Sequence, residues 1–344
     1  MMENKLMTDN PGRIFGVLPD GRRVDTFEIA DKHGIHMHVI NYGAIISAIR
    51  VPSTAGMLDV VLGFDTLEDY IASRDLPAPP YFGAVAGRYA GRISKGKFSI
   101  GDKSYRLNVN NNGNTLHGGI NGFDSVLWDV TNLTENSITM KYTSADGEEG
   151  FPGELTAAVT YTVEDHQIII EYEAVCSEDC PVNLTQHTYF NLDGHQGDIR
   201  TQELWVNSNK ILEIDEHNIP SGNIIPAATK HMDFSHGGTG FYGVDDSFVI
   251  DNTSEPAASL RSFSSGLKMT VLSDQPSVHI YAGGNLFGRL RGKHGAPYHT
   301  HSGICFESQH YPDSPNRAEF PNTILKKGET YRQRTIWKFE NTEA

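Results

Sequence analysis

Four stretches of the sequence place titratable side chains among glycines, turns or apolar residues, where a purely structural segment would hold few of them. In one, Glu307 follows three residues of apolar character, so its carboxylate is either exposed at a strand end or buried and hydrogen-bonded. In another, His187 alternates with Thr185 and Tyr189, so we expect the three to share one strand face. The stretches are YFGAVAGRYAGRIS (81–94), NNGNTLHGGINGFD (111–124), PVNLTQHTYFNL (181–192) and GICFESQHYPDSPN (303–316).

These residue types suit proton exchange. A glutamate carboxylate is ordinarily ionised at neutral pH and can accept a proton. An imidazole has both forms available near neutral pH, so it can give a proton and later recover it. One such residue alone is more often structural, but four stretches of this kind together indicate a site.

The sequence lacks motifs that are typical of several other reaction classes. The chain has no glycine-rich phosphate loop, no GxSxG and no HExxH, so we expect no nucleotide cofactor, phosphoryl transfer or serine nucleophile. The pairs His36/His38 and His299/His301 could each offer two ligands from one strand face, yet no cysteine or carboxylate cluster completes either set. We therefore predict neither a metal nor any other cofactor.

Composition limits the partners. The 344 residues include 38% hydrophobic residues, enough for a sizeable core, and 34 glycines, which fit a chain with many turns. A net charge of −15 opposes binding to nucleic acid or anionic lipid. The three cysteines form no disulfide framework, and the N-terminal stretch has no apolar signal region, so we expect a cytoplasmic protein.

Strand patterns recur from end to end. Alternating β-branched or aromatic residues mark strands at 36–42, 59–64, 137–143, 156–163, 167–175, 200–208, 267–273, 278–284 and 331–340. Only 66–74 reads as a helix, with Thr66 as its N-cap. No repeat period and no linker divides the chain. We predict an all-β fold, a large antiparallel β-sandwich, as one domain over 1–344, with 1–12 as a candidate disordered segment.

The motifs also carry a resemblance. The segments LHGG, HTYFNL and FESQHYPDSPN occur in that order, and NYGAIISAIRVP and DVVLGFDTLEDY precede them. In these segments, and over nearly its whole length, the chain resembles the galactose mutarotase (aldose 1-epimerase) family. The resemblance implies a β-supersandwich that interconverts the α and β anomers of a free aldose such as galactose or glucose. The oligomeric state, monomer or homodimer, stays open.

The resemblance also implies roles for individual residues. His187 matches the family's general acid and Glu307 its general base. His117 matches a sugar-contacting histidine, and Arg92 a hydroxyl-binding arginine, with membership of a structural ion pair as the alternative for Arg92. Asp245, in GVDDSF, matches an aspartate that holds a sugar hydroxyl.

Three positions depart from the family pattern. Gly91 stands where the family often has asparagine, Asp246 where it often has histidine, and His279 where it usually has a substrate-contacting glutamine. His279 could still donate to a hydroxyl, and Tyr189 adjoins His187 in its motif, so both are candidate substrate contacts. The departures leave the acid and base in place and leave the preferred aldose open.

Three alternatives remain at this point. A hexose-6-phosphate epimerase of the same superfamily would need basic residues at the pocket mouth; Lys326, Lys327, Arg332 and Arg334 cannot be placed from the sequence. A glycoside hydrolase would need two carboxylates, for which Asp245 and Glu307 are available. A non-catalytic sugar-binding module would usually have lost its acid or base, and this chain retains candidates for both.

Overall fold

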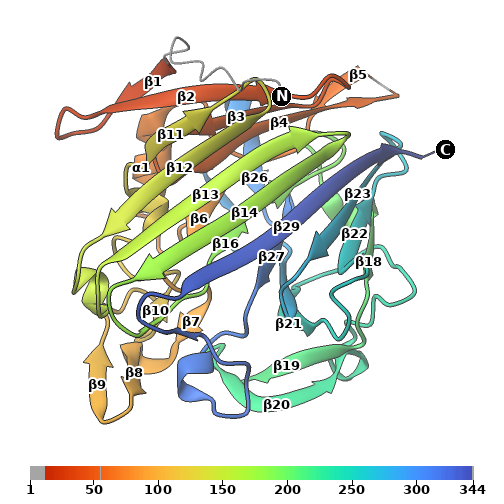
Figure 1. Ribbon diagram of the computed structural model, residues 1–344. Coiled ribbons are helices and arrows are strands. Elements are labelled where there is room, and N and C mark those ends of the chain that lie inside the picture. Colours follow the sequence, from red (N-terminus) through yellow and green to blue (C-terminus); the bar gives the residue numbers. More distant parts are fainter. Residues whose placement is uncertain (1–11, 55, 343–344) are drawn as a thin grey trace, which may run out of the picture.

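The computed structural model describes residues 12–54 and 56–342, and strands dominate it (Figure 1). The expected all-β fold of antiparallel sheets is confirmed by the pairing of its strands. The predicted disordered segment 1–12 lies, apart from Gly12, outside the described residues. The single-domain assignment stays a prediction.

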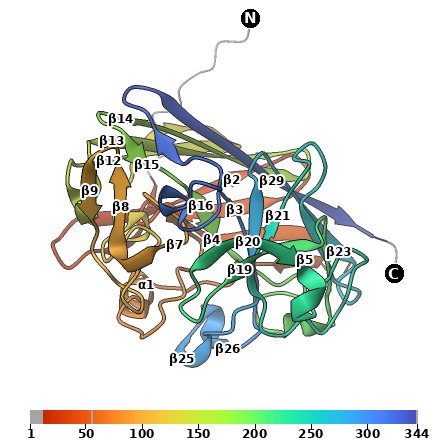
Figure 2. The ribbon, with the colours of Figure 1, turned by 90° about the horizontal axis from the view of Figure 1, so that it is seen from below.

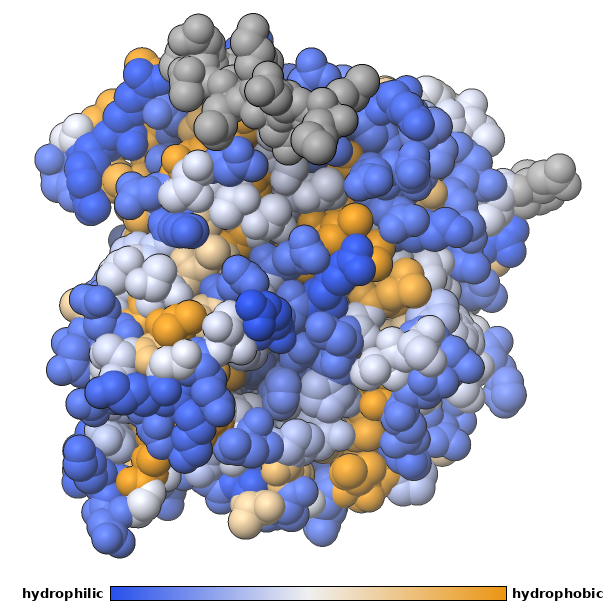
Figure 3. Space-filling view, viewed as in Figure 1, coloured by the Kyte–Doolittle hydropathy of each residue, from blue (hydrophilic) through white to orange (hydrophobic). Residues whose placement is uncertain are grey.

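An eight-stranded sheet forms the face seen in Figure 1. Its order is β11 (Asp129–Leu133), β12 (Ser137–Ser144), β13 (Leu155–Glu164), β14 (Gln167–Cys176), β29 (Thr330–Asn341), β23 (Leu267–Ser273), β22 (Ala258–Arg261) and β18 (Glu203–Val206). Side chains on these strands alternate between buried and more exposed positions, because successive residues of a strand point to opposite faces. The outward face is mainly hydrophilic with scattered apolar residues (Figure 3).

A six-stranded sheet lies behind it and carries most of the candidate site. Its order is β17 (Tyr189–Phe190), β27 (Ile304–Gln309), β24 (Ser277–Tyr281), β21 (Asp245–Val249), β19 (Lys210–Ile214) and β20 (Pro220–Pro226). The rings of Phe190 on β17 and Trp337 on β29 meet edge to face at 4.7 Å, and both residues are fully buried. The two sheets therefore pack against each other through a shared core, as in a sandwich.

Smaller sheets complete the molecule. A five-stranded sheet contains β1 (Arg13–Val17), β2 (Arg23–Ala30), β3 (His36–Ile40), β4 (Ile45–Ser53) and β5 (Gly56–Asp59). Two-stranded pairs join β6 (Ala84–Ala86) to β16 (Thr185–His187), β7 (Arg92–Ile93) to β10 (Thr115–Leu116), β8 (Lys97–Ile100) to β9 (Lys103–Arg106), β15 (Cys180–Pro181) to β28 (Ile324–Leu325), and β25 (Phe287–Arg291) to β26 (Pro297–His299). Figure 2 shows the hairpins β8–β9 and β25–β26 at the periphery.

The single α-helix of the described residues, α1 (Leu67–Ser73), begins where the sequence predicts. The Thr66 side chain accepts a hydrogen bond from the Asp69 amide, which satisfies one of the free N–H groups of the first turn. The strand expected at 59–64 is wrong for most of its length, because β5 ends at Asp59 and only Val61 forms an isolated bridge, to Phe190. No helix in the described part of the chain is long and apolar enough to cross a membrane.

Candidate active site

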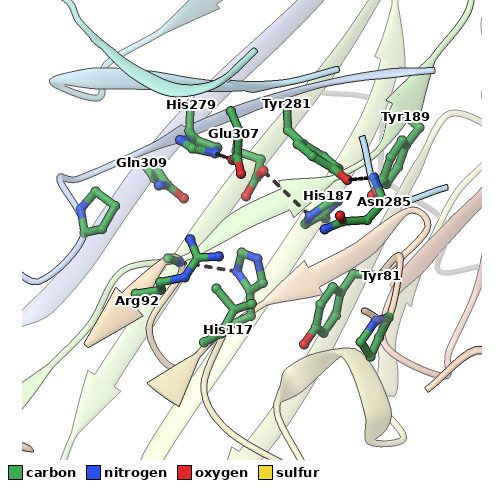
Figure 4. Close-up of a pocket in the computed structure, with 15 residues that line it drawn as sticks. Tyr81, Arg92, His117, His187, Tyr189, His279, Tyr281, Asn285, Glu307 and Gln309 are labelled. Carbon is green, nitrogen blue, oxygen red and sulfur yellow. Dashed lines mark hydrogen bonds and ion pairs between the residues drawn. The ribbon is translucent and has the colours of Figure 1, made fainter. Parts of the chain in front are cut away.

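One pocket gathers all seven residues that the sequence singled out. Figure 4 shows Glu307, His279 and Tyr281 on one side of it and Arg92, His117 and Tyr81 on the other. The described residues that line it are Pro79, Tyr81, Gly91, Arg92, Leu116, His117, His187, Tyr189, Asp245, His279, Tyr281, Asn285, Glu307, Gln309 and Pro312. Residues more than 200 positions apart in the chain thus meet at one site.

Strand register builds the floor of this pocket. On β27, Glu307 and Gln309 alternate with residues of the opposite face, so they point the same way. His279 on β24 lies directly opposite Glu307, and Asp245 on β21 lies opposite Tyr281. Three adjacent strands therefore present a grid of polar side chains on one face of a sheet.

His187 reaches the pocket from a different pair of strands. It ends β16 and pairs with Ala84 of β6, whereas Tyr189 begins β17 and pairs with Cys305. The expectation that 185, 187 and 189 share one strand is therefore wrong, because the chain leaves one sheet and enters another at Thr188. The two rings nevertheless stack, with centroids 5.2 Å apart and planes at 29°.

The central pair consists of His187 and Glu307. Nε2 of His187 lies 3.7 Å from Oε1 of Glu307, and the two side chains are 6% and 2% exposed. Oε2 of Glu307 is buried and has no hydrogen-bond partner among the described residues. A buried carboxylate oxygen without a donor is costly, so the site is arranged to receive a donor from a ligand.

His117 stands on the opposite wall in a left-handed backbone conformation, with φ of 50°. Its Nδ1 accepts a hydrogen bond from the Gly91 amide over 3.3 Å. Burial, reinforced by the neighbouring His187 and by Arg92, holds the pKa of His117 well below its usual range. The ring is therefore neutral, and with Nδ1 accepting, its proton sits on Nε2, which leaves Nε2–H as a donor.

Arg92 lies beside His117 and is half-buried. Its Nε donates to the Asn111 side chain over 3.0 Å, which fixes the guanidinium plane and leaves its other N–H groups for a ligand. Among the described lining residues it is the only lysine or arginine. Arg92 forms no ion pair with a carboxylate among the described residues, so its contacts do not support the ion-pair interpretation.

His279 and Asp245 form a hydrogen-bonded pair. Nε2 of His279 lies 2.9 Å from Oδ1 of Asp245, and Nδ1 lies 2.9 Å from the Ser247 hydroxyl. Burial works to lower the pKa of His279, but the bond to Asp245 and the nearby Glu307 raise it above its usual value. Burial likewise works to raise the pKa of Asp245, and the bond from His279 holds it below its usual value. The pair is thus a charge-assisted one.

Gly91 and Asp246, the other two positions that depart from the family pattern, lie in different surroundings. Gly91 has φ of 76°, and a Cβ there would lie 2.9 Å from Pro312 Cγ, so a side chain at this position meets both backbone strain and a rigid neighbour. Asp246 is buried away from the pocket lining, and its Oδ1 accepts from Nζ of Lys230 over 2.6 Å. Asp246 is thus a structural ion-pair member.

Sequence reasoning did not single out Tyr81, Tyr281, Asn285 or Gln309, which also line the pocket. Tyr81 packs its ring on His117 and His187, with centroids 4.9 Å and 5.6 Å away. Tyr81 and Gln309 fall within stretches already selected, so their polar groups beside the motif residues were an available signal. Asn285 lies in no selected stretch, and nothing in the sequence pointed to it.

His117, His187 and Glu307 could in principle hold a metal ion, since one ligand atom of each lies within 4.8 Å of the others. A metal at Nε2 of His117 would have to displace the proton that the Gly91 contact places there. The arrangement therefore fits a hydroxylated ligand better than an ion. The histidines of the two HxH pairs do not line the pocket, and His36 instead contacts Glu28 at 2.7 Å.

Known proteins resemble the chain over most of its length. A family model described as aldose 1-epimerase matches residues 25–338. A galactose mutarotase of Mus musculus is 41% identical over 339 residues, covering 95% of this chain and 97% of that protein. An aldose 1-epimerase of Escherichia coli (strain K12) is 31% identical over 340 residues, covering 93% and 96%.

A solved structure supports the same relationship. An aldose epimerase homologue from C. elegans superposes with a TM-score of 0.87 at 29% identity, covering 93% of this chain and 100% of that one. Fold, family model and sequence identity thus agree with the motifs LHGG, HTYFNL and FESQHYPDSPN. The chain belongs to the aldose 1-epimerase family.

Proposed function

We propose that this isomerase interconverts the α and β anomers of a free aldose, with Glu307 as general base and His187 as general acid. The observation that carries the proposal is the buried pair, in which Nε2 of His187 and Oε1 of Glu307 lie 3.7 Å apart. A sugar ring that inserts its anomeric end between them would meet a proton acceptor and a proton donor at once.

The reaction moves two protons and breaks one bond. Glu307 takes the proton of the C1 hydroxyl, the bond between C1 and the ring oxygen breaks, and the ring oxygen takes a proton from Nε2 of the His187 imidazolium. The open aldehyde rotates about its C1–C2 bond. Closure on either face reverses the transfers, so no oxidant, external nucleophile or cofactor is consumed.

The electrostatics of the pair favour this exchange. Before ring opening the pair is imidazolium and carboxylate, and afterwards it is imidazole and carboxylic acid. The pair's net charge is zero in both states, so the step creates no net charge in a buried site, where an uncompensated charge would be costly. Each residue of this kind typically contributes roughly 10²–10⁴-fold to the rate.

The unpartnered Oε2 of Glu307 supports a hydroxylated ligand. A sugar hydroxyl could supply the hydrogen bond that this oxygen lacks among the described residues. On the opposite wall, Nε2–H of His117 and the free N–H groups of Arg92 can donate to oxygens that gain charge as the ring opens. Asp245, whose side chain is 39% exposed, can accept from a further hydroxyl while it holds His279.

The substrate we propose is an unphosphorylated hexose, galactose or glucose. Relatives in the family are named galactose mutarotase, and Arg92 is the only lysine or arginine among the described lining residues. Of the four basic residues left open by the sequence, three form ion pairs elsewhere: Lys326 with Asp179, Arg332 with Glu173 and Arg334 with Glu171. None of them lines the pocket, so nothing there favours a phosphate.

Two alternative functions, a glycoside hydrolase and a sugar-binding module, have less support. A glycoside hydrolase would use Asp245 as the second carboxylate, but that carboxylate is bonded to His279, and the histidine beside Glu307 would have no role. A binding module would have no need of the imidazole beside Glu307. Release of nitrophenol from an aryl galactoside would favour the hydrolase.

Polarimetry tests the proposal directly. Freshly dissolved α-D-galactose, glucose, xylose and arabinose are followed to rotational equilibrium with and without the protein. We expect faster equilibration of the hexoses and none for galactose 6-phosphate beyond its spontaneous rate. Sugar binding by calorimetry without any acceleration would overturn the catalytic assignment in favour of a binding module.

We further propose a cytoplasmic, single-domain protein that acts as a monomer or homodimer. The three cysteines are free and buried, as is usual in a reducing compartment. The family model spans 25–338 without interruption, which supports one domain.

A further inference from the structure

The buried thiol of Cys305 contacts the catalytic histidine at the ring nitrogen that does not face Glu307. Its Sγ is 3.5 Å from Nδ1 of His187, whereas Nε2 of the same ring faces Glu307. Within the described part of the chain, this sulfur is the one hydrogen-bond partner of Nδ1. Cys305 is fully buried on β27, directly opposite Tyr189 and Tyr281 of the flanking strands.

The thiol in this position is uncharged. Burial, together with the nearby carboxylate of Glu307, raises the pKa of Cys305 well above its usual range. A neutral thiol carries a weak donor and a weak acceptor on the same sulfur. It can therefore hydrogen-bond a ring nitrogen without adding a charge beside it.

The acid role restricts where His187 may carry its protons. If Nε2 gives its proton to the ring oxygen and later recovers it, Nδ1 has to keep its own proton throughout the cycle. The neutral ring must then be the Nδ1–H tautomer, because a proton on Nε2 would leave that nitrogen unable to accept one. A tautomer is fixed by the hydrogen bond at the other nitrogen.

We propose that Cys305 is a positioning residue for the acid: its sulfur accepts the Nδ1–H of His187 and so keeps Nε2 as the nitrogen that exchanges the proton. This inference rests on the proposed acid role of His187. The bond persists in both protonation states of the ring, since Nδ1–H is present in the imidazolium and in the neutral tautomer.

The choice of a thiol has a consequence for acid strength. A carboxylate at this position would orient the ring equally well, but its charge would stabilise the imidazolium and make it a weaker acid. It would also place a second negative charge close to Glu307. A neutral sulfur orients the ring and leaves the proton on Nε2 free to move.

Nuclear magnetic resonance of ¹⁵N-histidine-labelled protein tests the tautomer without any change at Cys305. The His187 signals are assigned by comparison with the His187→Asn variant. At a pH where the ring is neutral, we expect a protonated Nδ1 and a bare Nε2. A protonated Nε2 in the wild-type protein would overturn the inference, whether or not any variant folds.

Two substitutions give the kinetic test. In Cys305→Ala, kcat for galactose should fall about 3- to 10-fold, the value of one ordinary hydrogen bond, with KM little changed and the Nδ1–H signal lost or mixed with the other tautomer. Cys305→Ser keeps an uncharged acceptor and should restore most of kcat and the Nδ1–H tautomer. Cys176→Ala removes another buried thiol that does not line the pocket and should leave kcat unchanged.

The outcomes separate the two proposals. If Cys305→Ala keeps both the wild-type kcat and the Nδ1–H tautomer while His187→Asn is inactive, the Cys305 inference fails and the acid assignment stands. If His187→Asn keeps near wild-type activity, the acid assignment itself fails.

Discussion

The imidazole of His279 lies between two carboxylates: its Nε2 is 2.9 Å from Oδ1 of Asp245, and Glu307 is its direct neighbour across the β24–β27 strand pair. Its Nδ1 contacts the Ser247 hydroxyl at 2.9 Å. A side chain whose charge depends on pH is thus built into the side of the pocket that we expect to hold a sugar hydroxyl. The uncharged amide that the family usually has here could not titrate.

We therefore expect KM for galactose to depend on pH through His279. The ring's pKa is raised above its usual value, so the charged pair persists at low pH and is lost as pH rises through that raised pKa. KM should rise over that range, because a neutral ring orients Asp245 less firmly. In His279→Gln, KM should stay flat there.

The measurement is polarimetric KM at a series of pH values. His36→Gln is the matched control, because His36 also contacts a carboxylate, that of Glu28 at 2.7 Å, and does not line the pocket. It should keep the wild-type pH dependence. Superimposable KM curves for the wild type and His279→Gln would refute the prediction.

Glu307→Gln should lose most of its activity, on the order of 10²–10⁴-fold in kcat, because the amide cannot accept the C1 proton at neutral pH. The side chain keeps its size in a site that is 2% exposed, so folding should be preserved. Polarimetry measures the rate, and calorimetry checks that galactose still binds. As a control, Glu173→Gln removes a carboxylate from an exposed ion pair with Arg332 and should keep the wild-type kcat. A kcat near the wild-type value in Glu307→Gln would reject the base assignment.

Much of the eight-stranded sheet could be predicted from the sequence. The pattern at 267–273 coincides with β23, and those at 137–143, 156–163, 167–175 and 331–340 fall within one residue of β12, β13, β14 and β29 at each end. These strands are long and covered on one face, so hydrophobic alternation marks them. The short strands β6, β16 and β17 are buried along their whole length and contain two or three residues, so they have no alternation to detect.

For the site, the sequence predicts which residues take part but not how they are arranged. The motifs identified His187 and Glu307, but the 3.7 Å between them depends on pairings of β16 with β6 and of β27 with β24, which link distant parts of the chain. Local patterns carry no information on such pairings. The contact of Cys305 with His187 could not be predicted for the same reason. A cysteine between two apolar residues is typical of a buried core position.

A buried ion pair anchors the turn between β25 and β26. Nζ of Lys293 lies 2.6 Å from Oδ2 of Asp59 and 3.0 Å from the Ser47 carbonyl, and Lys293 is 5% exposed. Lys293→Met should lower the free energy of unfolding by about 3–5 kcal/mol, because it leaves Asp59 as an uncompensated, largely buried charge.

Urea denaturation measures this loss. The double variant Asp59→Asn/Lys293→Met should recover part of it, since both charges are then gone. Lys210→Met breaks an exposed pair with Asp251 and should cost about 1 kcal/mol or less. Equal costs for the buried and the exposed pair would contradict the prediction.

Asp124 should make the protein less stable as pH rises from acid to neutral. Burial raises the pKa of this carboxyl to about 6, although Arg74, 3.6 Å away, works to lower it. Between its ordinary pKa and about 6, the folded state binds more protons at this group than the unfolded state does. The group's contribution to the free energy of unfolding therefore falls as pH rises through that range and is constant above it, a total change on the order of 2–3 kcal/mol.

Asp124→Asn removes the titrating group and keeps the shape of the side chain. The free energy of unfolding of the variant should therefore rise relative to that of the wild type as pH increases from about 4.5 to about 7.5. Urea denaturation at the two pH values measures the gain. Asp102→Asn, in the exposed turn between β8 and β9, should show no such pH-dependent difference. A constant offset between Asp124→Asn and the wild type at both pH values would mean that Asp124 is already ionised in the folded state at the lower pH, and that Arg74 outweighs burial.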